Sequence, residues 1–308
     1  MIPLIKRLLT IIPLMLVVTF LAFVLVRLAP GGPFEGERSF PSPMVEEAVK
    51  ARYHLDKPVL VQYGYFLKDL IQGDLGMSMK YRNHTVNDIV RQGLPVSMAL
   101  GLSAFAFAMS TGIILGVVAA WKRGRVSGDF ISLFALICIC VPSMVLGPVL
   151  VLAFAIYIPV FPTSGFHTPW HAVLPVLTLG IYYSGKISRL VSEGIQEAMT
   201  SDFIRTARAK GVGPVAVMFR HALPMGLLPV VSYSGPLLAD LLTGSFVVEN
   251  LFQIPGLGTF LVNSSLNRDH TMIVGLVLIY SFLVIFFNIV VDTLYSRLDP
   301  RIRSNPRP

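Results

Sequence analysis

The stretch TMIVGLVLIYSFLVIFFNIVVDTLY, residues 271–295, contains a single charged side chain, that of Asp292. An α-helix needs about 20 predominantly apolar residues to cross the hydrocarbon core of a bilayer, so this stretch predicts a membrane-spanning helix. Long runs of the same kind lie upstream, at residues 8–28, 94–121, 130–158, 172–192 and 225–249. Because backbone polar groups in lipid must be satisfied internally, we expect an all-α polytopic membrane protein with six transmembrane helices.

The composition of the whole chain agrees with this prediction. Hydrophobic residues make up 54% of the chain and charged residues 14%, whereas soluble domains carry about 25% charged residues. The first run follows Lys6 and Arg7, but it is too long for a secretory signal, and Ala29-Pro30-Gly31 is a poor cleavage site. We therefore expect the first run to be retained as a span within one transmembrane domain over residues 1–308.

Basic residues in the short connections predict the orientation of the spans. They gather at the two ends of the chain, between spans two and three, and between spans four and five: Lys6, Arg7, Lys122, Arg123, Arg125, Arg205, Arg208, Lys210, Arg220, Arg297, Arg301, Arg303 and Arg307. The opposite short connections hold little positive charge, with none in 159–171 and only Arg268 in 250–270. Both termini are therefore expected in the cytoplasm, with a long external loop at 29–93 and a cytoplasmic loop at 193–224. The net charge of +8 then reflects topology and lipid contact, and nothing in the chain indicates binding to nucleic acid.

The external loop 29–93 contains two predicted helices. Ser42-Pro43 suits the start of a helix that runs to about Tyr53, and Pro58 begins a second helix that ends before Gly73 and Gly76. One face of the second helix is apolar and comprises Val59, Tyr63, Phe66, Leu67, Leu70 and Ile71. This face is expected to pack either on the spans and the lipid interface, as a lid, or on another protein, as a docking surface.

Small residues and prolines mark contacts and bends in the spans. Gly112-x-x-x-Gly116 in the second span permits close approach of another helix, either within the bundle or in a dimer. Prolines interrupt or border the later spans, at Pro142, Pro148, Pro175, Pro224, Pro229 and Pro236. Membrane helices tolerate such kinks where neighbouring groups satisfy the freed carbonyls.

No arrangement of side chains predicts an enzyme or metal site. His167 and His171 have the i, i+4 spacing of a metal pair, but Pro169 lies between them and no acidic partner is near, so we interpret them as interfacial polar residues. Cys138 and Cys140 lie within the third span and point to different faces of a helix, which favours apolar filler over a disulfide or a metal pair.

One phosphate-loop match is rejected on its context. Residues 180–186 match Gly-x4-Gly-Lys, but Ile187 stands where Ser or Thr would bind Mg²⁺, and the match lies inside a membrane helix. The chain is not expected to hydrolyse nucleotide by itself.

Asp240 lies well inside the fifth span, where a charge is costly and indicates a function. Three interpretations remain open: Asp240 lines the route of a substrate, it pairs with another buried polar group, or it lies near a water-filled vestibule. Glu249, at the outer end of that span, and Asp292 are interpreted as interfacial.

The cytoplasmic loop contains the stretch Phe203-Ile-Arg-Thr-Ala-Arg-Ala-Lys-Gly211, followed twelve residues later by Leu223-Pro224. Ser201 or Asp202 can cap a helix that runs to Lys210, Gly211 suits its termination, and Pro214 begins a second short helix.

This helix has the features of a protein-docking site. Phe203, Thr206, Ala207 and Lys210 share one face, and Arg205 and Arg208 lie on another. Small side chains let a partner approach closely, Phe203 can fill an apolar hollow, and the cations can meet carboxylates. The alternative is a basic loop lying on anionic lipid. The predicted docking residues are Phe203, Arg205, Thr206, Ala207, Arg208, Ala209, Lys210, Gly211, Leu223 and Pro224.

Here the chain resembles the inner-membrane permease subunits of ATP-binding-cassette (ABC) importers, whose cytoplasmic loop carries Glu-Ala-Ala, then Gly, then Leu-Pro. Aligned on Gly211 and Leu223-Pro224, this EAA motif falls on Arg205, Thr206 and Ala207. Arg205 stands where the motif usually has Glu, and the stretch Arg-Thr-Ala-Arg-Ala-Lys-Gly at 205–211 is similar to the variant of this motif in the peptide-importer branch. Further segments resemble the first permease of oligopeptide and dipeptide importers: Val26-Arg-Leu-Ala-Pro-Gly31, Gly73-Asp-Leu-Gly76, Leu94-Pro-Val-Ser97, Val248-Glu-Asn-Leu-Phe252, Pro255-Gly-Leu-Gly258 and Asn267-Arg-Asp269.

The resemblance implies a type I ABC importer permease in the bacterial plasma (inner) membrane. Its implied partners are a second, homologous permease, two cytoplasmic ABC ATPases that bind ATP and Mg²⁺, and an external (periplasmic) substrate-binding protein. The helix at about 202–210 would be the coupling helix seated in an ATPase, and this chain itself would hold no cofactor. Peptides are the implied substrate. Nickel or another small solute moved by the same machinery is one alternative, and an ion-coupled secondary transporter that uses Asp240 is another.

Overall fold

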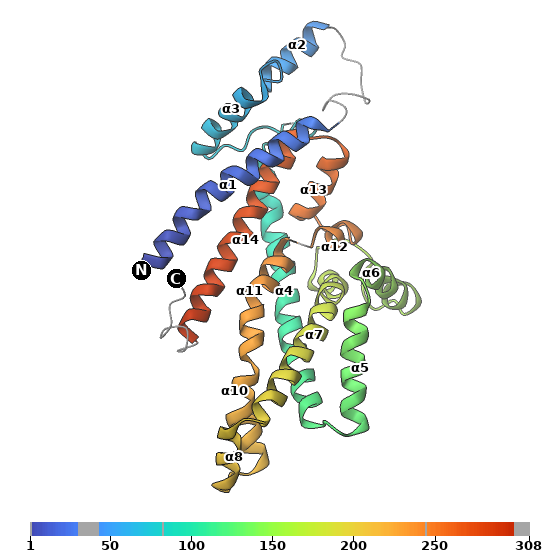
Figure 1. Ribbon diagram of the computed structural model, residues 1–308. Helices are drawn as coiled ribbons and strands as arrows, with labels where there is room; N and C mark the ends of the chain where they lie inside the picture. Colours follow the sequence, from blue (N-terminus) through green and yellow to red (C-terminus); the bar gives the residue numbers. More distant parts are fainter. Residues whose placement is uncertain (1, 30–42, 82, 244, 299–308) are drawn as a thin grey trace. The chain divides into compact units, whose positions relative to one another are not determined.

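The computed structural model describes residues 2–29, 43–81, 83–243 and 245–298, and over these residues the chain is helical, with no named strand. Figure 1 shows the helices with their labels. The chain divides into two compact units, Met1–Val96 with Pro255–Ile285 and Ser97–Ile254 with Phe286–Pro308, which are described separately. An all-α fold is confirmed.

The first unit is built from helices that are distant in the sequence. It contains α1 (Ile2–Leu28), α2 (Pro43–Arg52), α3 (Val59–Ile71), the start of α4 (Val86–Trp121), α13 (Leu257–Leu266) and most of α14 (His270–Leu298). Its core combines residues of α4, α13 and α14 with Leu75: Leu75, Val86, Ile89, Leu257, Met272, Leu276, Leu278 and Tyr280. A Cβ on Gly275 would lie 2.7 Å from Cγ1 of Val86, so glycine permits the close approach of α14 to α4.

The two helices of the predicted external loop, α2 and α3, form where the sequence predicts them, and α3 packs on α1. The Tyr63 hydroxyl lies 3.0 Å from Oγ1 of Thr19 and donates to the Leu16 carbonyl at 3.0 Å. Its ring meets those of Phe20 and Phe23 edge-on, at 5.2 and 5.3 Å between centroids. The predicted apolar face is therefore covered at Tyr63, whereas Ile71 at the end of α3 is 87% exposed.

The second unit is organised around α7 (Pro169–Met199). It also contains the rest of α4, α5 (Val126–Cys140), α6 (Ser143–Val151), a π-helical stretch at Leu152–Tyr157, α8 (Asp202–Ala209), α9 (Pro214–Ala216), a second π-helical stretch at Val217–Ala222, α10 (Leu223–Gly226), α11 (Leu228–Thr243) and α12 (Phe246–Leu251). Helices α5, α6, α10, α11 and α12 all contact α7.

The Gly112-x-x-x-Gly116 motif of α4 packs against α7. A Cβ on Gly112 would lie 2.8 Å from the Ser184 carbonyl oxygen, and one on Gly116 would lie 2.5 Å from that of Ser188. Any larger side chain would separate the two helices. The motif therefore serves packing within the chain, one of the two interpretations that the sequence left open.

The predicted third span, 130–158, is broken. Helices α5 and α6 meet at a bend of 102°, and Val141, at the break, has an extended backbone with φ −86° and ψ 115°. Pro142 follows it, and a residue before proline is sterically disfavoured in the helical region. The prolines therefore predicted a bend, although not its size.

Four helical segments in the described residues are long and apolar enough to cross a membrane: Ile11–Leu28, Val86–Trp121, Leu228–Leu251 and His270–Val290. The bent pair Val126–Cys140 and Ser143–Tyr157 would be a fifth if it forms one span. Helix α7 contains the predicted span 172–192 but is not among them. A polytopic membrane protein is supported, and six spans within one domain stay a prediction.

Candidate functional site

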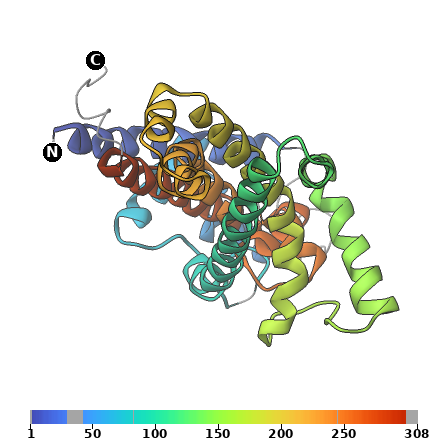
Figure 2. The ribbon, with the colours of Figure 1, turned by 90° about the horizontal axis from the view of Figure 1, so that it is seen from below.

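Helix α8 forms at the predicted place, at one end of the second unit (Figure 1), and the same end faces the viewer in Figure 2. Ser201 stands at the N-cap position, but its hydroxyl donates to the Ala198 carbonyl rather than capping α8. At the other end, Gly211 has a φ of +80°, which glycine adopts without strain. Its N–H donates to the Arg208 carbonyl at 2.9 Å, and the Val212 N–H donates to that of Ala207 at 3.2 Å, closing the helix.

The exposed side of α8 differs from the predicted face at one residue. Ile204 is fully buried and Ala207 is 8% exposed, so these two residues attach α8 to the rest of the unit. Ala207 is thus less accessible than the rest of the predicted face, because a short helix buries the stripe that packs best, and its contact with a partner stays a prediction. The other predicted docking residues of this stretch, Phe203, Arg205, Thr206, Arg208, Ala209, Lys210 and Gly211, are exposed.

The segment after α8 returns and packs on α7. Val217, Met218 and Ala222 of the π-helical stretch are buried. Gly226 at the end of α10 meets Gly194 of α7 so closely that a Cβ on Gly194 would lie 2.7 Å from the Gly226 carbonyl oxygen. Leu223 is half-buried and Pro224 is exposed, in the first turn of α10. We call residues 201–226 the α8 segment, a compact projection joined to α7 and α11 at its two ends.

Asp240 has a hydrogen-bond partner that sequence reasoning missed. The Tyr183 hydroxyl of α7 donates to Oδ2 of Asp240 on α11. The Asp240 side chain remains exposed on the surface of the unit and Tyr183 is half-buried. One turn further along α7, Nζ of Lys186 lies 4.6 Å from the centroid of the Tyr182 ring. A carboxylate, an ammonium group and tyrosines thus share the α7–α11 surface.

Glu249 is buried within the protein, which its predicted place at the outer end of a span did not indicate. It is 0% exposed, and Ser245 donates to its Oε1 at 2.6 Å. Val248 and Phe252 of the same stretch are also buried, and the Phe252 carbonyl accepts the Gly165 N–H at 2.9 Å. Residues 248–252 lie at the end of α12 and directly after it. Because the sequence places them at the end of a predicted span, it did not indicate that they would be buried within the protein.

Asp269 immediately precedes α14 and is fully buried. Its Oδ1 accepts the Met272 N–H at 3.0 Å, as an N-cap residue does. Its Oδ2 accepts the Ser78 hydroxyl, and the Lys80 N–H at 3.2 Å. Burial and this carboxylate raise the pKa of the nearby Tyr81. Asp269 thus fastens the segment of Ser78 and Lys80 to the start of α14, a role that its sequence did not reveal.

Thr168 caps α7, and His171, at the N3 position, completes a capping box with it. Nδ1 of His171 lies 2.8 Å from Oγ1 of Thr168, and Pro169 begins the helix, so the pair His167 and His171 straddles a helix start. Within the described residues, no three His, Cys, Asp or Glu side chains are grouped to hold a metal ion.

Comparison with known proteins places these features in a family. Residues 112–304 match the family model described as binding-protein-dependent transport system inner membrane component. The chain is 41% identical to the oligopeptide transport system permease protein OppB of Haemophilus influenzae, over 97% of this chain and 98% of that protein. It is 39% identical to the dipeptide transport system permease protein DppB of Bacillus subtilis, over 97% of each chain.

Solved structures support the fold. The inward-facing MetNI methionine ABC transporter matches with a TM-score of 0.55 at 17% identity, over 68% of this chain and 96% of that one. An amino acid ABC transporter with histidines matches with a TM-score of 0.56 at 16% identity, over 68% and 94% of the two chains. The fold is that of type I ABC transporter permeases, and the chain belongs to the family of binding-protein-dependent transport system inner membrane components.

Proposed function

We propose that this chain is the peptide-transporting permease subunit of an ATP-driven importer in the bacterial inner membrane. It would form the translocation pathway across the membrane with a second, homologous permease, and it would receive peptides from an external binding protein. Two cytoplasmic ATPases would bind ATP and Mg²⁺. Near-full-length relatives named as oligopeptide and dipeptide permeases support this proposal.

The observation that carries the proposal is the construction of the α8 segment. Its outer surface offers Phe203 (42% exposed) and Thr206 beside the cations Arg205 and Lys210, while Ile204 and Ala207 fix it from beneath. Among the residues that the structure describes, Arg205 forms an ion pair only with the exposed Asp202, at 3.6 Å, and such surface pairs are weak. The guanidinium is therefore available to a carboxylate on a partner.

The α8 segment would transmit the ATPase cycle as the coupling helix. A ligand shifts a conformational equilibrium only through its different affinities for the two states. ATP would favour one arrangement of the ATPases, and α8, seated in one of them, would move with it. The close contact of Gly194 with Gly226 would carry that motion into α7.

Asp240 would line the substrate route. A charge within a membrane span normally pairs or faces a wet cavity, and the partner here, Tyr183, is neutral. The exposed carboxylate can attract the ammonium group of a passing peptide. With Lys186 one turn away from Tyr183, the α7–α11 surface offers both signs of charge to a zwitterion.

Uptake measurements test the substrate and the energy source. We expect cells carrying the complete importer to take up a labelled tripeptide, with competition by unlabelled di- and tripeptides but not by nickel. Uptake in proteoliposomes should require ATP and persist with a protonophore. Competition by nickel would contradict the peptide assignment, and loss of uptake with the protonophore at constant ATP would favour a secondary transporter.

A further inference from the structure

Helix α3 lies beside the C-terminal half of α1, not beyond the end of that helix. The contact is formed by one stripe of each helix: Leu16, Thr19, Phe20, Phe23 and Arg27 of α1 and Gln62, Tyr63 and Phe66 of α3. An α-helix rises about 16 Å from Leu16 to Arg27, which is about half of the 30 Å hydrocarbon core of a bilayer. The helix α3 therefore runs alongside a segment, Ile11–Leu28, that is apolar enough to cross a membrane.

The sides of α1 that α3 leaves uncovered are apolar. Exposed side chains on these sides include those of Val17, Leu21 and Leu25. No charged residue occurs between Ile11 and Val26. The only hydroxyl in this stretch, that of Thr19, donates to the Met15 carbonyl at 2.7 Å. A helix with such a surface favours lipid over water, so the C-terminal half of α1 is expected within the hydrocarbon core.

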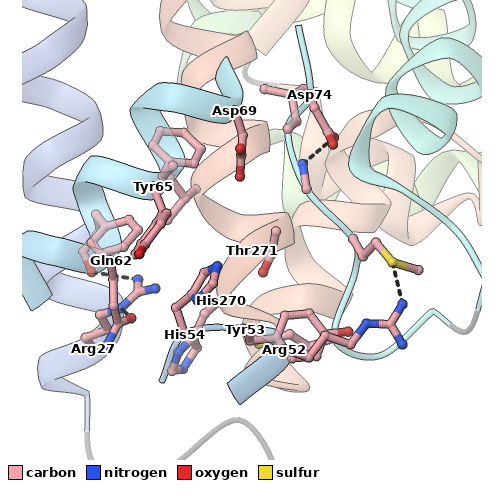
Figure 3. Close-up of a pocket in the computed structure, with 17 residues that line it drawn as sticks. Arg27, Arg52, Tyr53, His54, Gln62, Tyr65, Asp69, Asp74, His270 and Thr271 are labelled. Carbon is pink, nitrogen blue, oxygen red and sulfur yellow. Dashed lines mark hydrogen bonds between the residues drawn. The ribbon is translucent and has the colours of Figure 1, made fainter. Parts of the chain in front are cut away.

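The outward side of α3 continues this apolar surface. Its exposed side chains include those of Val59, Leu60, Val61 and Ile71. The two charged residues of α3, Lys68 and Asp69, both lie near its C-terminal end. Asp69 lines a polar cavity of about 230 Å³ within the first unit, shown in Figure 3, and a long lysine side chain can extend to the aqueous interface. The middle of α3 thus carries no charge.

The polar groups between α1 and α3 are satisfied within the protein, as lipid requires. Oε1 of Gln62 accepts a hydrogen bond from Nε of Arg27 at 2.7 Å, drawn as a dashed line in Figure 3. Nε2 of Gln62 donates to the Lys57 carbonyl at 2.8 Å. The guanidinium carbon of Arg27 lies 3.3 Å from the centroid of the Phe23 ring. The cation at the end of α1 is therefore held against the protein.

We propose that α3 is a re-entrant helix, which enters and leaves the membrane on the side of the predicted external loop. The acyl chains of phospholipids then pack against Leu60 and Val61, and the loop 29–93 is only partly in water. Apolar helices of about 10–14 residues are too short to span a bilayer and include re-entrant segments, and α3 has 13 residues. The proposal concerns topology and does not depend on the solute that is transported.

The other two possible environments of α3 agree less well with these contacts. Water around α3 would expose the apolar sides of α1 and α3 together, as one large patch. A partner protein could cover Leu60 and Val61, but the neighbouring surface of α1 belongs to a candidate span, and lipid is the solvent of such a surface.

Matched charge substitutions provide the first test. Leu60→Glu and Met44→Glu each replace an exposed apolar side chain, 71% and 80% exposed, at the second residue of a helix. A carboxylate is favourable in the first turn of a helix in water. Helix α2, which contains Met44, has four charged residues among ten and is expected in water. Since a charge in lipid is costly, Leu60→Glu should lower the recovery of folded importer complex by roughly tenfold or more, and Met44→Glu should not.

Nitroxide labels report the surroundings of α3 directly. In a background in which the two native cysteines are replaced by alanine, Leu60→Cys and Gly64→Cys are labelled in importer complexes in phospholipid nanodiscs. No atom lies within 4 Å of a Cβ added at Gly64, so this position accepts a label. Both labels should be relaxed by O₂, which concentrates in lipid, as strongly as a label at Leu25→Cys. Relaxation by water-soluble chromium oxalate should be lost at both, but retained at Met44→Cys.

Each contrary result would overturn the proposal. Relaxation of the Leu60→Cys and Gly64→Cys labels by chromium oxalate would place α3 in water, and protection from both reagents would place it beneath a partner protein. Relaxation of the Leu25→Cys label by chromium oxalate would place the C-terminal half of α1 outside the lipid. Equal recovery of Leu60→Glu and Met44→Glu would show that no charge enters lipid at α3. Peptide uptake by the wild type tests the proposed function separately.

Discussion

The pair of Asp240 and Tyr183 shows what sequence reveals about a single residue and what it does not. An acidic residue within an apolar run is easily recognised in a sequence, and it indicates a function because a charge in lipid is costly. Its partner depends on how α7 and α11 pack, which the pattern of either helix does not specify. The same limit applies to Glu249, whose burial follows from tertiary packing rather than from its place at a span end.

Asp240→Asn should impair transport while preserving the fold. The amide oxygen can still accept the Tyr183 hydroxyl, but the charge that attracts an ammonium group is lost. Hydrogen bonds to charged groups contribute about 1.5–3 kcal/mol, so uptake of peptide at low concentration should fall by roughly tenfold or more. Uptake of a labelled tripeptide is compared with that of Asp56→Asn, a change outside the spans. Equal uptake by Asp240→Asn and the wild type would exclude a role for this charge in the route.

Asp269→Ala should destabilise the first unit. It leaves the Ser78 hydroxyl and the Met272 N–H without this acceptor in a buried site, while the Lys80 N–H keeps its bond to Oγ of Ser78. Loss of an N-cap alone costs about 1 kcal/mol, and each unsatisfied buried group about 1–3 kcal/mol. The apparent unfolding temperature of the purified complex should drop well below that of Asp56→Ala, a control at an exposed aspartate. An unchanged temperature would show that this network is not structural.

The α8 segment illustrates prediction at the scale of an element. Its helix, its terminating Gly211 and the start of the next helix at Pro214 all follow from local capping chemistry and were predicted. The side of α8 that packs on the rest of the protein was not predicted, because helical spacing groups residues into faces without indicating which face is covered. Ala207, a predicted docking residue, is consequently also an anchor of α8 on the rest of the unit.

Gly194→Ala should uncouple ATP hydrolysis from transport. Alanine favours a helix over glycine by about 1 kcal/mol, so a loss of transport activity would not come from weaker helix formation. It would come from the added Cβ, which would lie 2.7 Å from the Gly226 carbonyl oxygen. Overpacking costs about 1–3 kcal/mol and would displace α10 from α7. Peptide-stimulated ATPase activity of the reconstituted complex should fall.

Gly213→Ala is the matched control for this contact. No atom lies within 4 Å of the Cβ it would add, and its φ of −66° suits alanine. It should retain wild-type activity. Equal activities in Gly194→Ala and Gly213→Ala would mean that the α7–α10 contact does not transmit motion.

At the scale of the whole molecule, apolar runs located the long helices well. Helices α1, α4 and α14 each contain the predicted span, although α4 begins at Val86 rather than at residue 94. The runs could not reveal the break between α5 and α6, since apolar composition alone does not distinguish one straight span from two bent helices. Nor does composition predict the π-helical stretches at Leu152–Tyr157 and Val217–Ala222, which depend on local packing.

The proposed orientation is tested by cysteine labelling. In a background in which Cys138 and Cys140 are replaced by alanine, Lys57→Cys in the external loop should react with a membrane-impermeant maleimide in intact spheroplasts. Val126→Cys, at a residue 86% exposed in a predicted cytoplasmic connection, should react only after permeabilisation. The reverse pattern would invert the topology.

Cross-linking from α8 tests the central claim most directly. In the same cysteine-free background, Thr206→Cys places a thiol on the exposed side of α8, and Val126→Cys places one on the same predicted membrane side but away from α8. A short bismaleimide applied to membranes that contain the whole importer should join Thr206→Cys to an ATPase subunit, with a yield that changes when ATP is added, and should leave Val126→Cys unlinked. An account in which α8 is the contact with the ATPases is contradicted if Thr206→Cys captures no ATPase, or if Val126→Cys captures it equally well.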